Sequence, residues 1–515
     1  MNHLSFPFLI LAIAAGPGPA FAAVASSVVI EDDFSTGSHG WTAFFLDHPE
    51  GVEDEWEMHA GLRELPQELA RPGTGFMITG NNHSDDLGMA LEKRLSPDDG
   101  LVPGQTYWVD FEIDFASNAP SGAFGVGGSP GDSVYLKAGA SATEPGGVLD
   151  PEDGHIRPTI NVGFQSVGGP AASSAGVIAN GRDAAEPAQF VALSRVHRHR
   201  FPVRAGAAGQ LWLLVMTDSA FEGPTTLYYL RIRASLTPVD IGDGSGIVNL
   251  SSRARVHPGD GALIAGFVVQ GEGPGSCVVR VVGPSLADHG IADPLGDPRL
   301  RLFHASDVLL MENDDWPAFP ALEALRAAMA GAGAFPLREN SSDAAVVAEL
   351  GAGIYTAVAS GGDDIPGTGL IEIYAVPAED RAGRLVNLST RANIGETAGN
   401  IITGLVIGGP HPERVLLRAA GPALAAHGVA NPAVDPVLTL YSGETVIATN
   451  QAWEKINAGE EIAAAAAEAG AFLFAEGSRD AALLVALAPG SYTLVVEEAE
   501  ITPARTALVE VYSVP

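Results

Sequence analysis

The polar side chains best suited to bind a ligand gather in one short segment, GNNHSDDL at residues 80–87. This segment offers amides, an imidazole, a hydroxyl and carboxylates between apolar flanks. Oxygen-rich loops of this kind suit a calcium ion or the hydroxyl groups of a sugar. The same residue types also build Asx turns that hold no ligand, and both interpretations stay open. The candidate ligand-binding residues here are Asn81, Asn82, His83, Asp85 and Asp86.

A second polar segment, TDSAFEG at residues 217–223, directly follows an apolar run. Loops that leave central strands often form the rim of a binding face. Asp218 and Glu222 therefore join the candidate ligand-binding residues.

Catalytic interpretations of the same residues stay open as alternatives. Tyr135, Lys137 and His83 are a candidate proton-transfer set for a polysaccharide lyase. Two separated acids such as Asp86 and Glu222 are a candidate glycosidase pair, but carboxylate spacing cannot be read from a sequence. No residue is assigned a catalytic role, because nothing in the sequence shows that these groups meet.

His197 and His199 have the spacing of two metal ligands on one strand face. The arginines around them, at positions 195, 198, 200 and 204, would repel a cation, which favours a solvated basic stripe. The chain contains neither a Gly-x-Ser-x-Gly nor a His-Glu-x-x-His motif, so common serine hydrolases and zinc proteases are not expected. A metal ligand set is left unassigned, and calcium stays a candidate cofactor.

Strands must position these segments, because glycine and proline are abundant and long helical patterns are scarce. Residues 107–115 carry an apolar side chain at every second position, which predicts a strand with one buried face. Residues 228–236 repeat that alternation. Residues 211–215 are apolar throughout and indicate a central strand. The sequence therefore predicts a jelly-roll-like β-sandwich ahead of residue 239.

The rest of the chain is an internal duplication of one unit. VNLSSRA at residues 248–254 returns as VNLSTRA at 386–392, and IEIY at 371–374 returns as VEVY at 509–512. Each copy alternates like a β-sandwich and holds one alanine-rich helical segment, at residues 321–330 and 460–468. The expected fold class is all-β, with the N-terminal jelly-roll-like sandwich followed by two tandem β-sandwich repeats, each carrying one short helical insertion.

The N-terminus has the pattern of a secretory signal peptide, with a short apolar run at residues 4–15 and small residues at 20 and 22. The expected location is therefore secreted, either extracellular or periplasmic. No later stretch approaches the roughly 20 apolar residues of a membrane-spanning helix. The expected divisions are a signal peptide at 1–25, the jelly-roll-like sandwich at 28–238, a linker at 239–247, repeat 1 at 248–377, a linker at 378–385 and repeat 2 at 386–515.

A site that the repeat needs should survive duplication. Arg280 and Arg418 survive, and the favoured interpretation is a structural arginine paired with a retained acid such as Asp343 or Asp480, not an anion clamp. Trp316 and Trp453 also survive, as expected core residues. The repeats therefore offer no catalytic constellation and are expected to act as self-contained, ligand-poor spacers or contact modules. One core shared by both copies, with a polar pocket at their seam, would contradict that expectation.

The formal net charge of -34 argues against nucleic acid and against anionic membrane surfaces. It favours divalent cations or neutral ligands. The single cysteine, Cys277, has Val415 at its position in the second copy, which predicts a small buried apolar residue and not a reactive thiol.

Several segments carry a resemblance to known families. DFS at residues 33–35 with HGW at 39–41 is similar to the opening strand of jelly-roll carbohydrate-binding modules. GNNHSDDL, SVYLKAGA at 133–140 and EGPTTLYY at 222–229 resemble an uncharacterised family of exported bacterial jelly-roll-like proteins. The repeats resemble tandem β-rich modules of large secreted bacterial proteins. These resemblances imply export and architecture, and they transfer no catalytic residue.

The sequence thus predicts a secreted, non-catalytic binding protein. Its N-terminal domain is expected to engage an extracellular polysaccharide, a surface glycan or a similar polar ligand, with calcium assistance as an option. The alternatives are a structural cell-envelope or matrix protein, or a polysaccharide-active lyase or hydrolase that uses the same domain.

Overall fold

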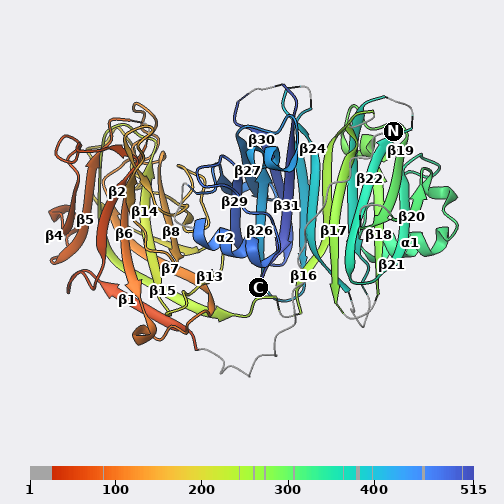
Figure 1. Cartoon of the computed structure of the whole chain (residues 1–515). Helices are drawn as coiled ribbons and strands as arrows, with labels where there is room; N and C mark the ends of the chain where they lie inside the picture. Colours follow the sequence, from red (N-terminus) through yellow and green to blue (C-terminus); the bar gives the residue numbers. More distant parts are fainter. Residues whose placement is uncertain are drawn as a thin grey trace.

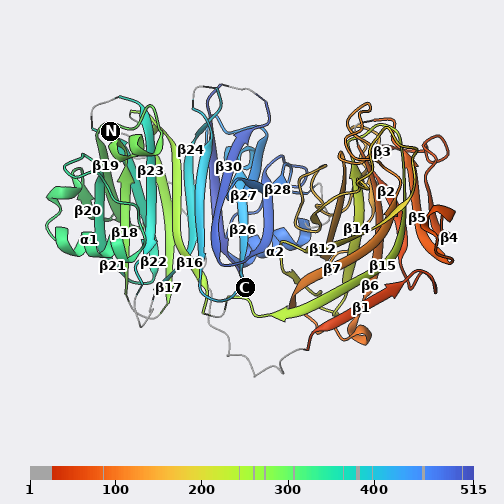
Figure 2. The same ribbon diagram turned by 180° about the vertical axis from the view of Figure 1, so that it is seen from behind.

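The computed structural model describes residues 26–515 apart from 85, 243, 259–260, 272–273, 306–307, 363–364, 378–382, 397, 455–458 and 501–502. The expected signal peptide lies outside these residues. The protein is all-β, as predicted. The N-terminal sandwich, repeat 2 and repeat 1 follow one another in space in that order (Figures 1 and 2), so the N-terminal sandwich lies beside the repeat farther from it in sequence. In the described part, no helix is long and apolar enough to cross a membrane.

The N-terminal domain is a sandwich of two antiparallel sheets around one apolar core. The first sheet contains β12 (Val191–Arg198), β7 (Thr106–Ser117), β15 (Pro224–Val239), β5 (Thr74–Asn81) and β4 (His59–Glu64), with β1 (Val28–Asp33) paired to β15 and β13 (Val203–Arg204) paired to β7. The second contains β11 (Ser173–Val177), β8 (Val134–Ser141), β14 (Leu211–Ser219), β6 (Leu87–Leu95) and β2 (Thr42–Leu46).

The expected strands form as their side-chain patterns require. In β7, Val109, Phe111, Ile113 and Phe115 are buried in the core, while the residues between them are partly exposed. The strand β14 is apolar on both faces and lies in the middle of its sheet, between β8 and β6. Its inward face joins the sandwich core, and its outward face packs under a covering segment.

That covering segment runs over the outer face of the five-stranded sheet. It includes a small sheet of β3 (His48–Pro49), β10 (His155–Pro158) and β9 (Gly147–Leu149). Ile160 and Val162 from this segment pack on Leu214 and Met216 of β14 to form a second apolar cluster. Polar residues on the outward face of β8 and β14 are therefore enclosed rather than exposed to solvent.

Each repeat is a two-sheet sandwich with one short helix. In repeat 1 the sheets are β16 (Gly246–Val256), β23 (Gly367–Ala375), β18 (Gly275–Val282) and β21 (Ala344–Leu350), and β17 (Leu263–Gly271), β22 (Gly353–Gly361), β19 (Pro298–His304) and β20 (Val308–Asn313). In repeat 2 they are β24 (Gly383–Ile394), β31 (Arg505–Ser513), β26 (Glu413–Ala420) and β29 (Ala481–Leu487), and β25 (Ile401–Gly408), β30 (Gly490–Glu498), β27 (Pro436–Ser442) and β28 (Thr445–Asn450).

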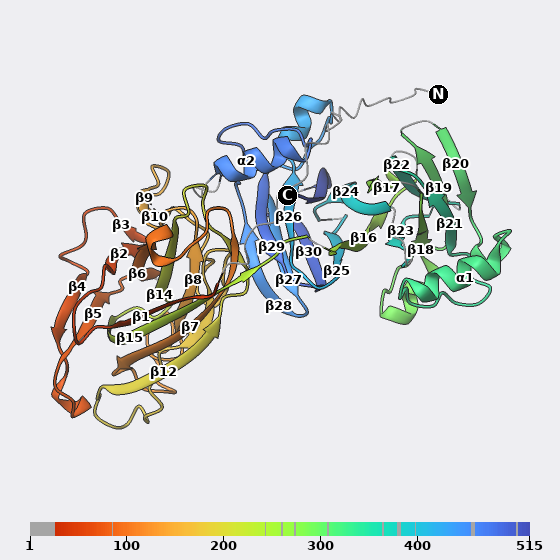
Figure 3. The same ribbon diagram turned by 90° about the horizontal axis from the view of Figure 1, so that it is seen from below.

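The predicted helical insertions are α1 (Leu322–Gly331) and α2 (Gly459–Glu468). α1 packs on β21 and β18, and α2 packs on β29 and β26. Figure 3 shows the two helices on opposite faces of the joined repeats. Each helix covers a small apolar cluster around the retained tryptophan, Trp316 or Trp453, and both tryptophans are buried as expected.

The expectation that the repeats are self-contained is wrong. Strand β16 of repeat 1 pairs with β25 of repeat 2, and β24 of repeat 2 pairs with β17 of repeat 1. One apolar core therefore runs through both copies. Of the expected linker at 378–385, residues 378–382 lie outside the described part, and residues 383–385 already belong to β24. The copies join because each presents two strand edges whose hydrogen bonds only a second copy satisfies.

The retained arginines are structural, but their expected partners are wrong. The Nε of Arg280 donates to Glu372, and Arg418 Nη1 lies 3.1 Å from Glu510 Oε2. Both acids lie on the neighbouring strand, directly opposite the arginine. Asp343 and Asp480 instead accept backbone N–H groups at the turns that begin η4 (Pro284–His289) and η6 (Pro422–His427). A carboxylate that caps a turn in this way satisfies buried donors that no carbonyl reaches.

Candidate functional site

The two predicted polar segments meet at one end of the N-terminal sandwich. β5 ends and β6 begins at this end, and β14 and β15 are connected there. Asn82 joins the two connections, because its Nδ2 donates to the carbonyl oxygens of Ser219 at 3.1 Å and Phe221 at 3.0 Å. We call this region the loop end, defined by residues 82–84, 86, 118–133, 162–165 and 220–223. Asp218 was expected in a loop after the central strand, but it lies within β14 and is buried, and only residues 220–223 form the connection.

The Asx-turn interpretation describes Asn82. Its Oδ1 accepts the Ser84 N–H at 3.0 Å, and the side chain is buried. Asn81 ends β5 and donates its N–H to the Trp56 carbonyl oxygen. His83 is exposed, and its ring lies 5.6 Å from the buried Trp56 ring. Asn82 is thus a structural residue, while His83 faces solvent.

Two further candidate ligand-binding residues come from these segments, Asp85 and Glu222. Asp85 lies outside the described residues. The backbone N–H of Glu222 donates to the carbonyl oxygen of Val126, which ties the 118–133 loop to the loop end, and its side chain is partly exposed.

Asp218 and Lys137 form a buried ion pair on the outward face of the five-stranded sheet. Lys137 Nζ lies 2.7 Å from Asp218 Oδ2, and the two side chains are 0% and 4% exposed. Lys137 also donates to the Val162 carbonyl oxygen, and Asp218 Oδ2 accepts the Gln165 N–H. Residues 162 and 165 belong to the covering segment. The pair therefore fastens that segment to the sheet, and each charge is neutralised where it is enclosed.

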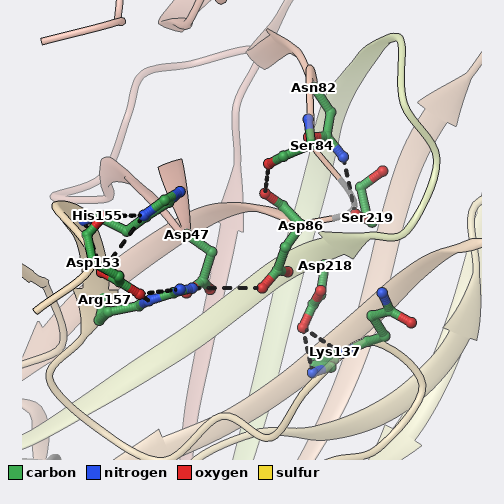
Figure 4. Close-up of polar contacts among 11 residues, drawn as sticks. Asp47, Asn82, Ser84, Asp86, Lys137, Asp153, His155, Arg157, Asp218 and Ser219 are labelled. Carbon is green, nitrogen blue, oxygen red and sulfur yellow. Dashed lines mark hydrogen bonds and ion pairs between the residues drawn. The ribbon is translucent and has the colours of Figure 1, made fainter. Parts of the chain in front are cut away.

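Asp86 lies next to this pair and remains accessible. Its side chain is 17% exposed, and its Oδ2 lies 3.9 Å from Arg157 Nη1. Arg157 also donates to Asp47 Oδ1 at 2.8 Å, and its side chain contacts Asp153 on the outside. Figure 4 shows these carboxylates arranged around Arg157 and Lys137. Three acids, Asp47, Asp86 and Asp218, thus share two cations.

Protonation of one carboxylate removes the excess negative charge of this cluster. Burial, and then the carboxylates of Asp47 and Asp218, raise the pKa of Asp86 from 3.8 to about 9. Oδ1 of Asp86 and Oδ1 of Asp218 are buried, and neither accepts a hydrogen bond from a donor in the described part of the chain. In Figure 4 these two oxygens point toward one another. A proton held on Asp86 by this raised pKa would satisfy both oxygens at once.

Exposed aromatic rings surround this end of the domain. Phe124, in the 118–133 loop, is fully exposed, and Phe164 is 56% exposed. Phe164 directly precedes Gln165, whose N–H binds Asp218. Exposed rings and a partly exposed carboxyl group in neighbouring segments are a combination that suits the faces and hydroxyl groups of a sugar.

The site does not assemble the alternative catalytic sets. Lys137 is fully enclosed and held by Asp218, so it cannot exchange a proton with a substrate next to Tyr135 or His83. Asp86 and Asp218 are in hydrogen-bonding contact. That is closer than the separation of roughly 5–9.5 Å between the two acids of glycosidases. These observations do not favour a lyase centre at Lys137 or a glycosidase pair of Asp86 and Asp218, and the predicted pair of Asp86 and Glu222 stays a prediction.

The residues that sequence analysis considered for metal binding are engaged otherwise. Ser173 Oγ lies 2.8 Å from His197 Nε2 and 3.0 Å from His199 Nδ1. Burial lowers the pKa of His197 to about 4 and that of His199 to about 3. Across the described residues, no group of three or more histidine, cysteine or acidic side chains is placed to hold a metal ion. In the acidic cluster, Arg157 and Lys137 already fill the cation positions.

Sequence reasoning missed three residues of the site. Asp47 follows β2 with a positive φ of 60°, and its N–H donates to the Ile156 carbonyl oxygen. Arg157 and Phe164 come from the covering segment. A left-handed residue between a strand and a turn, and a lone arginine in a polar loop, give no pattern that a sequence alone displays.

No protein-family model and no curated protein matches the chain. Among solved structures, it is similar to the N-terminal CBM22-1–CBM22-2 tandem domain of Xyn10C from Paenibacillus barcinonensis, with 13% sequence identity, coverage of 69% of this chain and 100% of that chain, and a TM-score of 0.20. A TM-score this low supports no argument about the ligand of this protein.

Proposed function

We propose that this chain is an exported, non-catalytic binding protein whose N-terminal sandwich engages a carbohydrate or a similar polyhydroxylated ligand at the loop end. The observation that carries the proposal is the partly exposed carboxyl group of Asp86, 3.9 Å from Arg157, together with the exposed ring of Phe164. Phe164 is next to Gln165, which binds Asp218. The proton of Asp86 is directed to Asp218, so the other Asp86 oxygen accepts from a sugar hydroxyl group and the partly exposed guanidinium of Arg157 donates to one. Calcium is not part of the proposal, because Arg157 and Lys137 neutralise the acids.

The exposed rings give the clearest test, because they can be removed without cost to the core. Glycan-array binding of the full chain is compared with that of Phe164→Ala and Phe124→Ala. We expect both variants to lose binding while their melting temperatures stay unchanged, since both rings are exposed. Stacking on an exposed ring contributes on the order of 1 kcal/mol to binding, so each substitution should weaken the affinity about fivefold or more.

Val196→Ala is the matched control. Val196 is 81% exposed on β12, in the other sheet of the same domain. We expect it to bind like the natural chain. Binding that is insensitive to both phenylalanine substitutions, or equally sensitive to Val196→Ala, would remove the loop end as the binding site.

A further inference from the structure

A large cavity lies where the N-terminal sandwich meets the joined repeats. Its volume is about 1570 Å³, and its walls include Arg204 of β13, Gln270 of β17, Ser389 of β24 and Tyr512 of β31. Ligand pockets usually measure about 300–1,000 Å³, so this space fits a chain of several units. The repeats thus share one core and border a pocket at their seam, which contradicts the expectation that they are ligand-poor.

The floor of this cavity is the outward face of β24. Leu385 and Leu388 point into the shared core, and Arg384, Asn387, Ser389 and Arg391 line the cavity. A strand rises about 3.3 Å per residue, so the two arginines lie about 23 Å apart along it. The floor is therefore an elongated polar stripe with a guanidinium at each end.

Asn387, Ser389 and Arg391 of this stripe belong to the segment that duplication preserved best, whereas Gly246 stands at the position of Arg384 in the first copy. Asn249, Ser251 and Arg253 of β16 correspond to Asn387, Ser389 and Arg391 of β24. The asparagine has a structural task in both copies, because its Nδ2 donates to a backbone carbonyl oxygen of the neighbouring strand, Ile373 or Val511. Ser389 is buried and bonds the Asn387 side chain, so its retention is structural as well. Arg391 lines the cavity at the end of this segment.

The two stripes differ in their surroundings. The β24 stripe is walled by the N-terminal sandwich and by the connection at residues 239–242, whereas Asn249, Ser251 and Arg253 of the β16 stripe are not part of this cavity. The protein therefore contains a matched pair of stripes, one enclosed and one outside the cavity, on a single scaffold.

The charge of the cavity departs from that of the chain. The chain has a formal net charge of -34, with 28 basic residues in all, yet four arginines line this one space: Arg204, Arg384, Arg391 and Arg414. Burial, and then the nearby Arg204, lower the pKa of Arg414, so two like charges face each other there.

The acids of the cavity are partly engaged by the protein itself. Glu510 is held by Arg418 and Tyr512. Glu413 accepts a hydrogen bond from Ser513 and lies 3.6 Å from Arg384, and burial raises its pKa. Asp240 and Glu468 also line the cavity. Four arginines thus line the cavity with four acids, against 28 basic and 62 acidic residues in the whole chain, so this lining suits carboxylates of a ligand better than the rest of the chain does.

A peptide is less suited to this floor than a sugar. Strand β17 is paired with β22 and β24, and β24 is paired with β17 and β31. No strand edge is therefore open there for main-chain hydrogen bonds with a peptide. The guanidinium groups at the two ends of the stripe match the carboxylate and hydroxyl groups of a ligand instead. We propose that this cavity binds a linear oligosaccharide that carries carboxylates, with Arg384 and Arg391 as the anion-binding residues.

Titration calorimetry on the full chain tests the proposal with an oligogalacturonate and a neutral galactose oligomer of the same length. We expect saturable binding of the charged oligomer, at least fivefold weaker binding of the neutral one, and loss of affinity between 50 and 500 mM salt, roughly the range over which charges become screened. Arg391→Gln should weaken binding of the charged oligomer at least fivefold. Arg253→Gln, the same change on the β16 stripe, should leave it within twofold.

Two further variants keep the test decisive. Arg384→Gln changes a side chain that is 46% exposed, so it tests the cavity even if Arg391→Gln fails to fold. Phe164→Ala alters the loop end, and binding here should survive it, because this proposal does not rest on the loop-end site. The proposal is overturned if neither oligomer saturates, if the neutral one binds equally well, if Arg253→Gln matches Arg391→Gln, or if poly-glutamate binds as tightly.

Discussion

Ile247 of β16 lies opposite Leu385 of β24, so the first strands of the two repeats meet at the centre of the joined sandwiches. Both side chains are buried in the shared core. On either side of this contact, β16 pairs with β25 of repeat 2, and β24 pairs with β17 of repeat 1. The duplication seen in the sequence therefore produces one folding unit and not two independent domains.

Repeat 1 alone should not be a stable monomer. Residues 246–377 without repeat 2 leave the edges of β16 and β17 open and expose core residues such as Leu250 and Phe267 to water. We expect this fragment to dimerise or precipitate, as measured by size-exclusion chromatography with light scattering. The fragment 246–515 at the same concentration is the control and should be monomeric. A monomeric repeat 1 that melts at the same temperature as the pair would contradict the shared core.

Asp86 should make the protein less stable as pH rises. The fold raises the pKa of this carboxyl group from 3.8, the ordinary value of an aspartic acid, to about 9, so the native state keeps a proton that the unfolded chain releases. The free energy of unfolding should therefore fall between about pH 4 and pH 9 and level off above that range. Asp86→Asn should flatten this slope and raise the melting temperature at pH 8. Some slope should remain, because burial also raises the pKa of Asp47.

Asp153→Asn is the matched control for that experiment. Asp153 contacts the same Arg157, but this exposed contact lowers its pKa below 3.8. Its stabilising effect is present above about pH 4 and lost only in acid, so Asp153→Asn should keep the slope of the natural chain between pH 5 and pH 9. Equal slopes in Asp86→Asn and the natural chain would show that Asp86 is ionised in the fold.

Lys137→Met should be strongly destabilising. It leaves the carboxylate of Asp218 enclosed without its cation, which costs about 3–5 kcal/mol in comparable buried pairs. The double variant Lys137→Met with Asp218→Asn should recover a large part of that loss, because no buried charge remains. Urea denaturation at pH 7 measures both. Arg198→Met, which removes a surface pair with Asp110, should cost less than about 1 kcal/mol. Similar costs for Lys137→Met and Arg198→Met would rule out this account.

Cys277 should be unreactive until the protein unfolds. The side chain is buried, and burial raises the pKa of its thiol to about 12, whereas only the thiolate attacks a disulfide reagent. We expect no labelling by Ellman's reagent in buffer and one thiol per chain in urea. Cys277→Val should change the free energy of unfolding by less than about 1 kcal/mol, since valine occupies this position in repeat 2. Rapid labelling of the native chain would contradict this burial.

The regular elements were predictable because their side chains obey the strand period. The alternation at residues 107–115 predicted the buried face of β7, and the apolar run at 211–215 predicted the central place of β14. The helices α1 and α2 lie within one residue of their expected start. The periodicity of apolar side chains shows which face of a strand is buried. It does not show which other strand pairs with its edge.

The joining of the repeats was missed for that reason, although the sequence held a signal. VNLSSRA and VNLSTRA are the best-kept stretches of the duplication, and they form the strands that join the copies. At the candidate site, Asp86 and Asp218 were identified from polar loops after apolar strands. Asp47 and Arg157 were not, because their contact depends on a covering segment that crosses the sheet from far away in the sequence.

The way the repeats join also limits how many can be joined. β16 pairs with β25, and the equivalent strands β24 and β17 pair in the same way. Each copy therefore uses the same two edges toward its neighbour. This is an isologous contact, related by a local two-fold axis. Such an arrangement closes on itself. A third copy fused to this chain would find both joining edges occupied, and it could add to the array only through some different surface.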